Sequence, residues 1–184
     1  MGIRVLFFVI SEFSKLEDRD KQIKFISDNL YPGEKVPENT KNMQNMSISD
    51  LKYLVKTGHT IGSHTTSHLR LSAVAGREAL VNEIVSGADW LQDQLDVNID
   101  HFAYSFGNLS SFSREALNVA RARFPYIFTG MRGDNSKSVQ PWAIRRDTIA
   151  VKDSLNLVGA FTEGAADFRY KKSLRVYESW GIHR

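Results

Sequence analysis

The sequence predicts an α/β protein built on a parallel sheet or a (β/α) barrel. Residues 3–10 form a nearly continuous apolar run, which is typical of a strand buried on both faces in a sheet covered by helices. Helical patterns then alternate with short strand-like runs, and short connections of this kind imply right-handed crossovers between parallel strands. Because 184 residues with 42% apolar content suffice for one sizeable core, we expect a single domain over residues 1–184.

The first half of the chain predicts two helices and a second strand. Residues 18–30 carry apolar side chains at helical spacing and are followed by a Pro-Gly pair, so they are predicted to be helical. Residues 34–46 are polar without a period and are expected to form a loop. Ser47 opens the next helix, Gly58 ends it, and a short strand over residues 59–63 follows.

The second half continues the alternation of helices and strands. A strong amphipathic helix is predicted over residues 76–95, because apolar side chains recur there at spacings of three and four. The later predicted elements are a strand over 99–104, a helix beginning at Ser113, a strand over 126–130, a loop over 132–140, a strand over 143–151 and a helix over 154–161. Residues 165–184 carry weak patterns.

Composition and charge exclude several classes of protein. Cysteine is absent, so there is no disulfide framework and no thiolate metal site. The net charge of +3 is small, and the one basic cluster, residues 169–172, is too sparse for a nucleic-acid interface. Residues 3–10 are too few for a membrane span and lack a signal peptide's cleavage pattern. We therefore expect no membrane segment and no export signal in this sequence, which favours a cytoplasmic location.

A cluster of histidines follows the predicted strand over residues 59–63. His64 and His68 stand four residues apart, so a tight turn between them would place both rings on one face. Hydroxyl side chains at 65–67 can bond nearby backbone groups and fix such a turn. Imidazole nitrogen binds zinc and similar ions, so this pair is a candidate metal site. A chance pair with a structural role is the alternative, and His59 is interpreted as structural.

Residues 58–68 read GHTIGSHTTSH and resemble the second motif of the polysaccharide deacetylase family, the NodB-homology or family 4 carbohydrate esterases. In that family the outer histidines of His-Ser/Thr-x-x-His bind a catalytic divalent metal, usually zinc. The resemblance implies that His64 and His68 are metal ligands. It also implies a distorted (β/α) barrel of the NodB-homology type, and in such barrels the ligand site lies at the carboxyl ends of the strands.

Residues 102–107 read FAYSFG and resemble the third motif of the same family, although Ser105 replaces the family's proline. In that family the backbone N–H of the motif's aromatic residue stabilises the tetrahedral oxyanion. The resemblance implies that Phe106 supplies this N–H and that Tyr104 lies along the sugar groove. Packing into the core is an equal alternative for Phe106 and the preferred interpretation for Phe102.

The family's first motif, Thr-Phe-Asp-Asp, supplies its catalytic base and third metal ligand and should precede the strand at residues 3–10. The sequence begins at that strand, so we predict an amino-terminally incomplete domain whose first strand is missing. Asp134 is a candidate substitute carboxylate, with a turn-forming role as the alternative. Arg146 falls near the expected fourth motif and could steady a carboxylate or the substrate, with a surface arginine on a strand as the alternative. His183 is not assigned to the late motif, because chain ends fray.

The resemblance implies a hydrolase that removes N-acetyl groups from a polysaccharide or a sugar precursor. A divalent metal, expected to be zinc, would polarise the amide carbonyl and acidify a bound water for an aspartate base. The expected partner is an N-acetylated carbohydrate. A non-catalytic sugar-binding or structural relative without the catalytic aspartates is the alternative, and a metal site of an unrelated hydrolase is a third reading.

Overall fold

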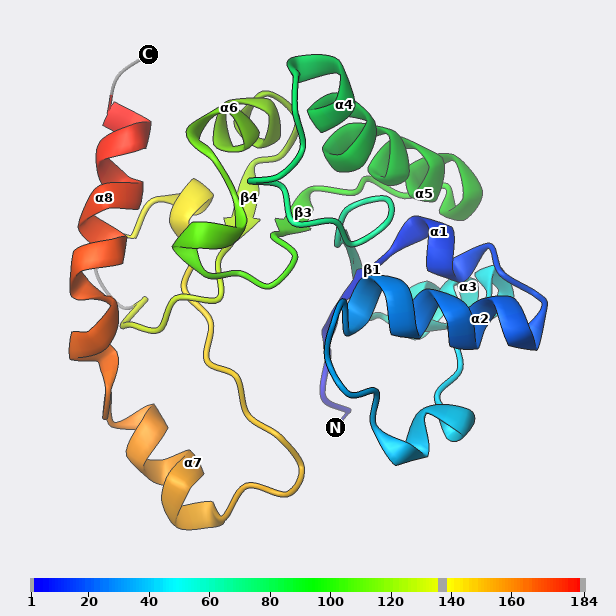
Figure 1. Ribbon diagram of the computed structural model, residues 1–184, viewed down its shortest axis with the longest axis horizontal. Coiled ribbons are helices and arrows are strands. Elements are labelled where there is room, and N and C mark those ends of the chain that lie inside the picture. The colour runs from blue at the N-terminus through cyan, green and yellow to red at the C-terminus, as the bar shows by residue number, and fades with distance from the viewer. Residues whose placement is uncertain (1, 136–138, 183–184) are drawn as a thin grey trace.

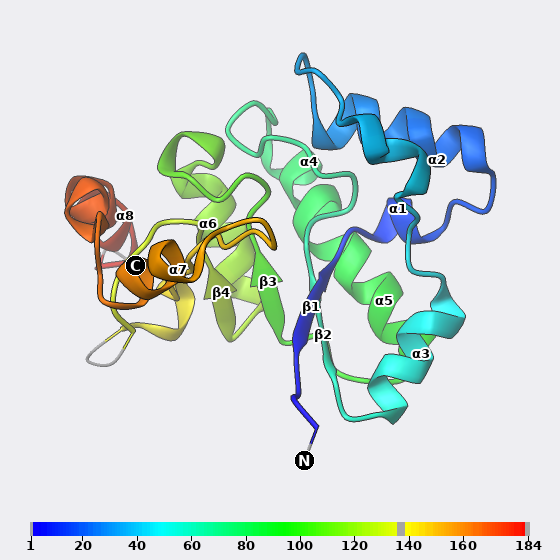
Figure 2. The ribbon, with the colours of Figure 1, turned by 90° about the horizontal axis from the view of Figure 1, so that it is seen from below.

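Four parallel strands form one sheet in the order β1-β2-β3-β4 in the computed structural model, which describes residues 2–135 and 139–182 (Figure 1). The strands lie side by side (Figure 2) and are β1 (Leu6–Val9), β2 (Thr60–Ser63), β3 (His101–Ala103) and β4 (Tyr126–Phe128). Each lies inside a strand that the sequence predicts. The predicted α/β class with a parallel sheet is confirmed.

Helices connect the strands and continue after the last one. They are α1 (Ser11–Ser14), α2 (Arg19–Phe25), α3 (Ile48–Lys56), α4 (Arg77–Val81), α5 (Gly87–Leu95), α6 (Arg114–Arg123), α7 (Leu155–Thr162) and α8 (Lys171–Ile182). Wider helical turns extend α2 over Ile26–Leu30 and join α4 to α5 over Asn82–Ser86, so the predicted helices over 18–30 and 76–95 are each continuous. None of the described helices has the length and apolar character needed to cross a bilayer.

Capping side chains set the starts of the helices where the sequence predicts them. Ser47 accepts a hydrogen bond from the backbone N–H of Asp50, whose carboxylate in turn accepts from the Ser47 N–H, a complete capping box for α3. Ser113 caps α6 and Ser154 caps α7 in the same way, each accepting from the N–H three residues later. These three predicted helix starts are confirmed.

The core lies between the sheet and the helices that follow β2 and β3. Five of the seven members of the apolar stripe predicted over residues 76–95 are at 6% exposure or less, and Val81 and Val85 are half-buried against the core. The five are Leu80, Ile84, Ala88, Leu91 and Leu95. Helices α3 and α5 pack against β2. Packing of such an apolar face supplies most of the stability of a helix in a folded protein.

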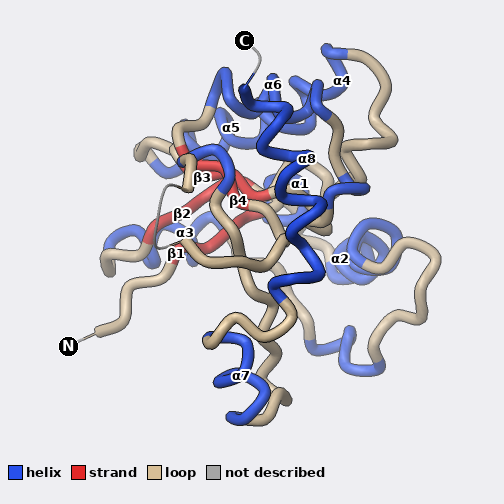
Figure 3. Tube along the Cα trace, turned by 90° about the vertical axis from the view of Figure 1, so that its left-hand side faces the viewer, coloured by secondary structure: helices blue, strands red, loops and turns tan. Residues whose placement is uncertain are grey.

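Two predictions about the fold need correction, and one stretch without a prediction contains a helix. The strand over 3–10 is not buried on both faces: β1 is an edge strand that pairs with β2 alone among the described residues, and its Phe7 and Phe8 are half-buried. The strand over 143–151 is wrong: only Ile144 forms a bridge to β4, and the chain then leaves the sheet. The weak stretch over 165–184 contains α8, which anchors through two buried residues, Leu174 and Tyr177. Helix α7 lies away from the sheet (Figures 1 and 3).

Candidate functional site

The two motif loops meet at the carboxyl ends of β2 and β3. Parallel strands end at one edge of a sheet, so residues that follow neighbouring strands come together there. The N–H of His64 donates to the Val9 carbonyl at 2.9 Å and holds the first loop against β1. The N–H of Gly130 donates to the Gly107 carbonyl at 2.8 Å and holds the second loop against the end of β4.

The rings of His64 and His68 lie together, with their centroids 5.0 Å apart. The Nδ1 atom of His64 is 2.8 Å from the carbonyl oxygen of Ala103, and that of His68 is 2.9 Å from the carbonyl oxygen of Asn29. Since a carbonyl oxygen only accepts hydrogen bonds, each Nδ1 carries the proton and donates it. The Nε2 atom of each neutral ring keeps its lone pair, which is the arrangement that orients metal-binding histidines.

Burial keeps both imidazoles neutral. It lowers the pKa of His64 from 6.5 to about 4, while the Ala103 carbonyl raises that pKa and the charges of His68 and Arg146 lower it. Burial also lowers the pKa of His68, against the opposing effects of the Asn29 carbonyl and the Glu83 carboxylate. Neutral imidazole is the form that ligates metals, so the pair is prepared for that role near neutral pH.

The free energy of unfolding of the metal-free protein is expected to fall as the pH drops from 6.5 towards 4. In this range the unfolded chain protonates His64 and the folded protein does not, because the folded pKa is about 4. Stability from this group is fully present above the unfolded pKa, and at pH 5 the loss is about 2 kcal/mol relative to neutral pH. Urea denaturation at the two pH values measures it.

A His64→Gln variant provides the control for this prediction. It should lose most of the acid dependence that His64 contributes, and His68 retains a smaller dependence of the same sign. Equal acid dependence in the parent and the variant would contradict the assignment of this effect to His64.

Backbone strain gathers at the site. Thr65, His68 and Phe106 have φ angles of 66°, 66° and 61°, and they are three of the five non-glycine residues with positive φ in the described part of the chain. Such conformations cost of order 1–3 kcal/mol each and concentrate at functional sites. The predicted tight turn between the histidines is confirmed by the Oγ1 of Thr65, which accepts the His68 N–H at 2.9 Å.

Hydroxyl groups fasten this turn to its surroundings. The Oγ1 of Thr65 lies 3.2 Å from the Oγ of Ser105, which joins the two motif loops through a buried hydrogen bond. Thr66 donates to the Asn82 carbonyl and Ser67 to the Glu83 carboxylate, both at 2.7 Å. The Asn82–Ser86 turn thus supports the histidine loop, as widened helical turns often do at functional sites.

Phe106 lies beside the histidine pair. Its ring centroid is 4.8 Å from that of His68, and the residue is half-buried. Within the described residues its backbone N–H donates no hydrogen bond, so this donor is available to a ligand. The alternative of packing into the core does not account for a side chain that borders both cavities described below.

Tyr104 packs mostly into the core, and it also borders one of the two cavities beside the site. Its side chain is fully buried, stacks on Phe112 with ring centroids 3.9 Å apart, and brings its hydroxyl 3.3 Å from that of Tyr177. Phe102 is buried too, as predicted. Alternate residues of a strand share a face, so Tyr104 follows Phe102 into the core even though it borders a cavity near the site.

Arg146 belongs to the site and is not a surface arginine on a strand. Its Nε donates to the Thr129 carbonyl at 2.9 Å, and its guanidinium lies 5.2 Å from the Phe8 ring centroid. Burial lowers its pKa, yet an arginine with no other perturbation stays charged near neutral pH. Its charge reaches His64, whose pKa it lowers.

The pair of imidazoles fits a divalent metal as two of its ligands, because both Nε2 lone pairs are free of protons. In the described residues no group of three His, Cys, Asp or Glu side chains is placed to hold a metal ion. Asp134 therefore does not complete the pair as a substitute carboxylate, and its carbonyl accepts a hydrogen bond from Arg145 in a loop. His183 lies outside the described residues.

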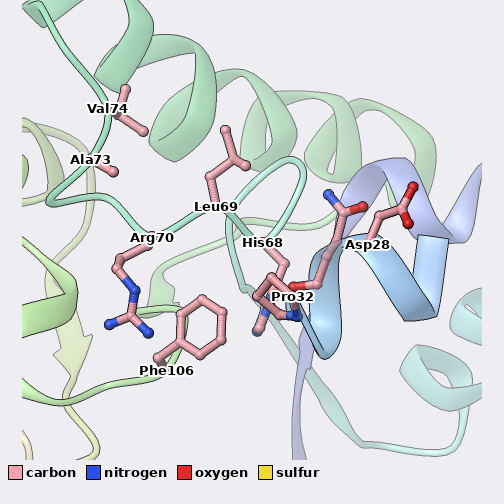
Figure 4. A pocket seen from close by; sticks show the side chains of 9 residues that line it. Asp28, Pro32, His68, Leu69, Arg70, Ala73, Val74 and Phe106 are labelled. Carbon is pink, nitrogen blue, oxygen red and sulfur yellow. Dashed lines mark hydrogen bonds between the residues drawn. The ribbon is translucent and has the colours of Figure 1, made fainter. Parts of the chain in front are cut away.

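Two cavities flank Phe106. The first, of about 420 Å³, is bordered by His68 and Arg70 (Figure 4). The second, of about 350 Å³, is bordered by His64 and Arg146. A ligand group held at the two histidines would therefore have space on either side, which suits an extended substrate.

The sequence did not point to the groups that orient the two imidazoles. The carbonyls of Asn29 and Ala103 belong to the backbone, which is the same at every residue, and each lies 39 positions away from its histidine. Glu83 accepts a hydrogen bond from Ser67 in the histidine loop, but in the sequence it is one of several polar residues of an amphipathic helix and does not stand out. Only the packing of these elements brings the two carbonyls to the imidazoles and the carboxylate to the loop between them.

Comparisons with known proteins show the family and the fold of this chain. Residues 2–124 match the family model described as polysaccharide deacetylase. Among solved structures, a polysaccharide deacetylase from Bacillus cereus has a TM-score of 0.62 at 13% identity, over 88% of this chain and 42% of that one. The Streptococcus pyogenes deacetylase PplD in complex with acetate has a TM-score of 0.63 at 19% identity, over 86% of this chain and 58% of that one. IcaB from Ammonifex degensii has a TM-score of 0.59 at 20% identity, over 89% of this chain and 61% of that one.

The matched structures are longer than this chain. The chain spans about half the length of the solved structures named, and their TM-scores, at identities of 20% or less, show a shared fold alone. No curated protein sequence matches the chain.

Proposed function

The chain belongs to the polysaccharide deacetylase family, and we propose that it contributes to the metal-dependent removal of N-acetyl groups from a polysaccharide or a sugar precursor. The observation that carries this proposal is the pair of imidazoles at the strand ends. Both are neutral, both have Nδ1 held by a backbone carbonyl, and both keep a free Nε2 lone pair.

Four of the described residues would each have a separate role in such a reaction. His64 and His68 would hold a divalent metal, zinc by its preference for imidazole, and the metal when bound supplies Lewis-acid polarisation and a more acidic water. The N–H of Phe106, which has no partner among the described residues, would donate to the acyl oxygen as negative charge develops on it. Arg146 would steady a carboxylate or the substrate beside His64.

A carboxylate is still needed as the base and as a third metal ligand, since no group of three His, Cys, Asp or Glu side chains among the described residues is placed to hold a metal ion. Strand β1 pairs with β2 alone, so its other edge is open among the described residues. A strand bearing Thr-Phe-Asp-Asp, added to that edge, would end next to Val9 at the end of β1, and the Val9 carbonyl already accepts the N–H of His64 from the other side. This open edge supports supply of the carboxylates by a strand next to β1.

Acetate release from N-acetylglucosamine oligomers tests the proposal. It should be measured with added zinc on the 184-residue chain and on the same chain extended at its amino end by a strand carrying Thr-Phe-Asp-Asp. We expect the extended protein to release acetate at least about 100-fold faster, because a positioned general base contributes about 10²–10⁴-fold. A His64→Ala change in the extended protein should abolish release.

His101→Ala is the matched control for that change. His101 lies on β3 and stacks on Tyr126, away from both cavities, so the variant should keep its activity. An extended protein that retains zinc and releases no acetate would count against catalysis.

That negative result would support the second candidate, a non-catalytic sugar-binding relative of the fold. The specific observation in its favour is that no third metal ligand stands near the histidines in the part of the chain that the structure describes.

A further inference from the structure

Arg70 stands next to the candidate site on the wall of the first cavity. It follows His68 by two residues, and its guanidinium carbon lies 4.6 Å from the centroid of the Phe106 ring. That ring in turn lies 4.8 Å from the His68 ring. Figure 4 shows the guanidinium beside Phe106, with Asp28 on the far side of the cavity in this view. Arg70 and His68 thus both contact the Phe106 ring, and both border the first cavity.

The charges around this cavity do not balance. Asp28 contributes a carboxylate to its wall, but that carboxylate already pairs with Lys24 at 2.6 Å, one helical turn earlier. Arg70 has no ion pair with any described residue, and its side chain donates no hydrogen bond to one. Its contact with the Phe106 ring leaves the N–H donors of the guanidinium available to an anion.

The second cavity repeats the pattern. Asp147 on its wall pairs with Arg132 at 2.8 Å, while Arg146 has no carboxylate partner among the described residues. The cavity on each side of Phe106 is therefore bordered by an arginine that has no ion pair among the described residues. The aspartate on the same wall forms its ion pair with a different basic residue. The site as a whole favours a negatively charged ligand.

The rest of the first cavity suits a sugar ring. Four apolar residues share its wall with Arg70: Pro32, Leu69, Ala73 and Val74. A pyranose has apolar C–H faces, and a mostly apolar cavity with a few polar groups is the usual form of a small-ligand site. A guanidinium at the edge of such a cavity can bind a carboxylate or a phosphate with two parallel hydrogen bonds.

We propose that Arg70 and the first cavity select N-acetylated carbohydrates that carry an anionic substituent, a carboxylate or a phosphate. This inference rests on the proposed function, because it treats the histidine pair as the place where the acetyl group is held. Arg70 acts here on substrate choice and takes no part in bond breaking.

Binding of three monosaccharides to the metal-free protein tests the inference, since without metal no anion can be held by a metal ion. The probes are N-acetylglucosamine, which is neutral, N-acetylmuramic acid, which adds a carboxylate, and N-acetylglucosamine 6-phosphate. Titrations followed by NMR give each Kd for the parent, for Arg70→Gln and for Arg175→Gln. Arg175 is an exposed arginine on α8 that borders neither cavity, so its variant controls for general loss of charge.

We expect at least one anionic sugar to bind about tenfold or more tightly than the neutral sugar, as charge-assisted hydrogen bonds allow. Arg70→Gln should remove this preference, and Arg175→Gln should keep it. The sugar that shows the preference identifies the anion. Equal Kd values for the three sugars, or a preference that survives Arg70→Gln, would overturn the inference and leave the proposed function standing. Failure of all three sugars to bind would also overturn the inference, whereas the proposed function is decided separately by acetate release from the extended protein with zinc.

Discussion

Replacing His64 and His68 together by alanine is expected to abolish zinc binding by the protein. The two rings pack edge to face with their centroids 5.0 Å apart, and each directs a free Nε2 lone pair away from its carbonyl partner. Loss of only an outer hydrogen-bonding partner of a metal ligand costs about 10–100-fold in affinity, so loss of both ligands should exceed about 100-fold. Zinc retained after dialysis, measured by mass spectrometry, gives the result directly.

His59→Ala is the matched control for the double variant. His59 belongs to the same short stretch of sequence, but it precedes β2 and its Nδ1 accepts the N–H of Val5 at 3.2 Å. It also packs against Phe7, which agrees with the structural role expected for it. Zinc retention should therefore be unchanged in His59→Ala. A double variant that retains as much zinc as the parent would disprove the site, and a parent that retains none would show that two imidazoles alone are too few.

Gly107→Ala is expected to destabilise the protein by about 3–4 kcal/mol, the sum of a left-handed backbone and a steric overlap. Gly107 has a φ of 72°, and a Cβ placed there would lie 2.6 Å from the Gly130 nitrogen and 2.7 Å from its Cα. Neither atom can move away easily, because the Gly130 N–H bonds to the Gly107 carbonyl at 2.8 Å. Urea denaturation measures the change in the free energy of unfolding.

Gly33→Ala separates the two causes of this loss. Gly33 has nearly the same φ, 75°, but a Cβ there would meet nothing within 4 Å. The Gly33→Ala variant should therefore lose only the part of the stability that comes from the left-handed backbone, about 1–2 kcal/mol. If both variants lost the same stability, the close approach of the Phe106 loop to Gly130 would have no energetic weight, and the rigid placement of Phe106 would need another cause.

Local patterns in the sequence determined much of this protein. The α/β class follows from apolar runs of strand length between helical stripes, and the starts of α3, α6 and α7 follow from their capping serines. The histidine turn follows from hydroxyl residues that bond within a few positions, as Thr65 does to His68. In each case the atoms that decide the structure lie close together in the chain.

The tertiary structure alone decided the rest. Tyr104 is in the core because Tyr177, 73 positions later, packs on it, and Arg146 is at the site because the chain leaves β4 after Ile144. The imidazoles take their tautomers from carbonyls 39 positions distant, and Arg70 obtains its place from a ring on another loop. Contacts between distant segments depend on how whole elements pack, and no local pattern of side chains encodes that packing.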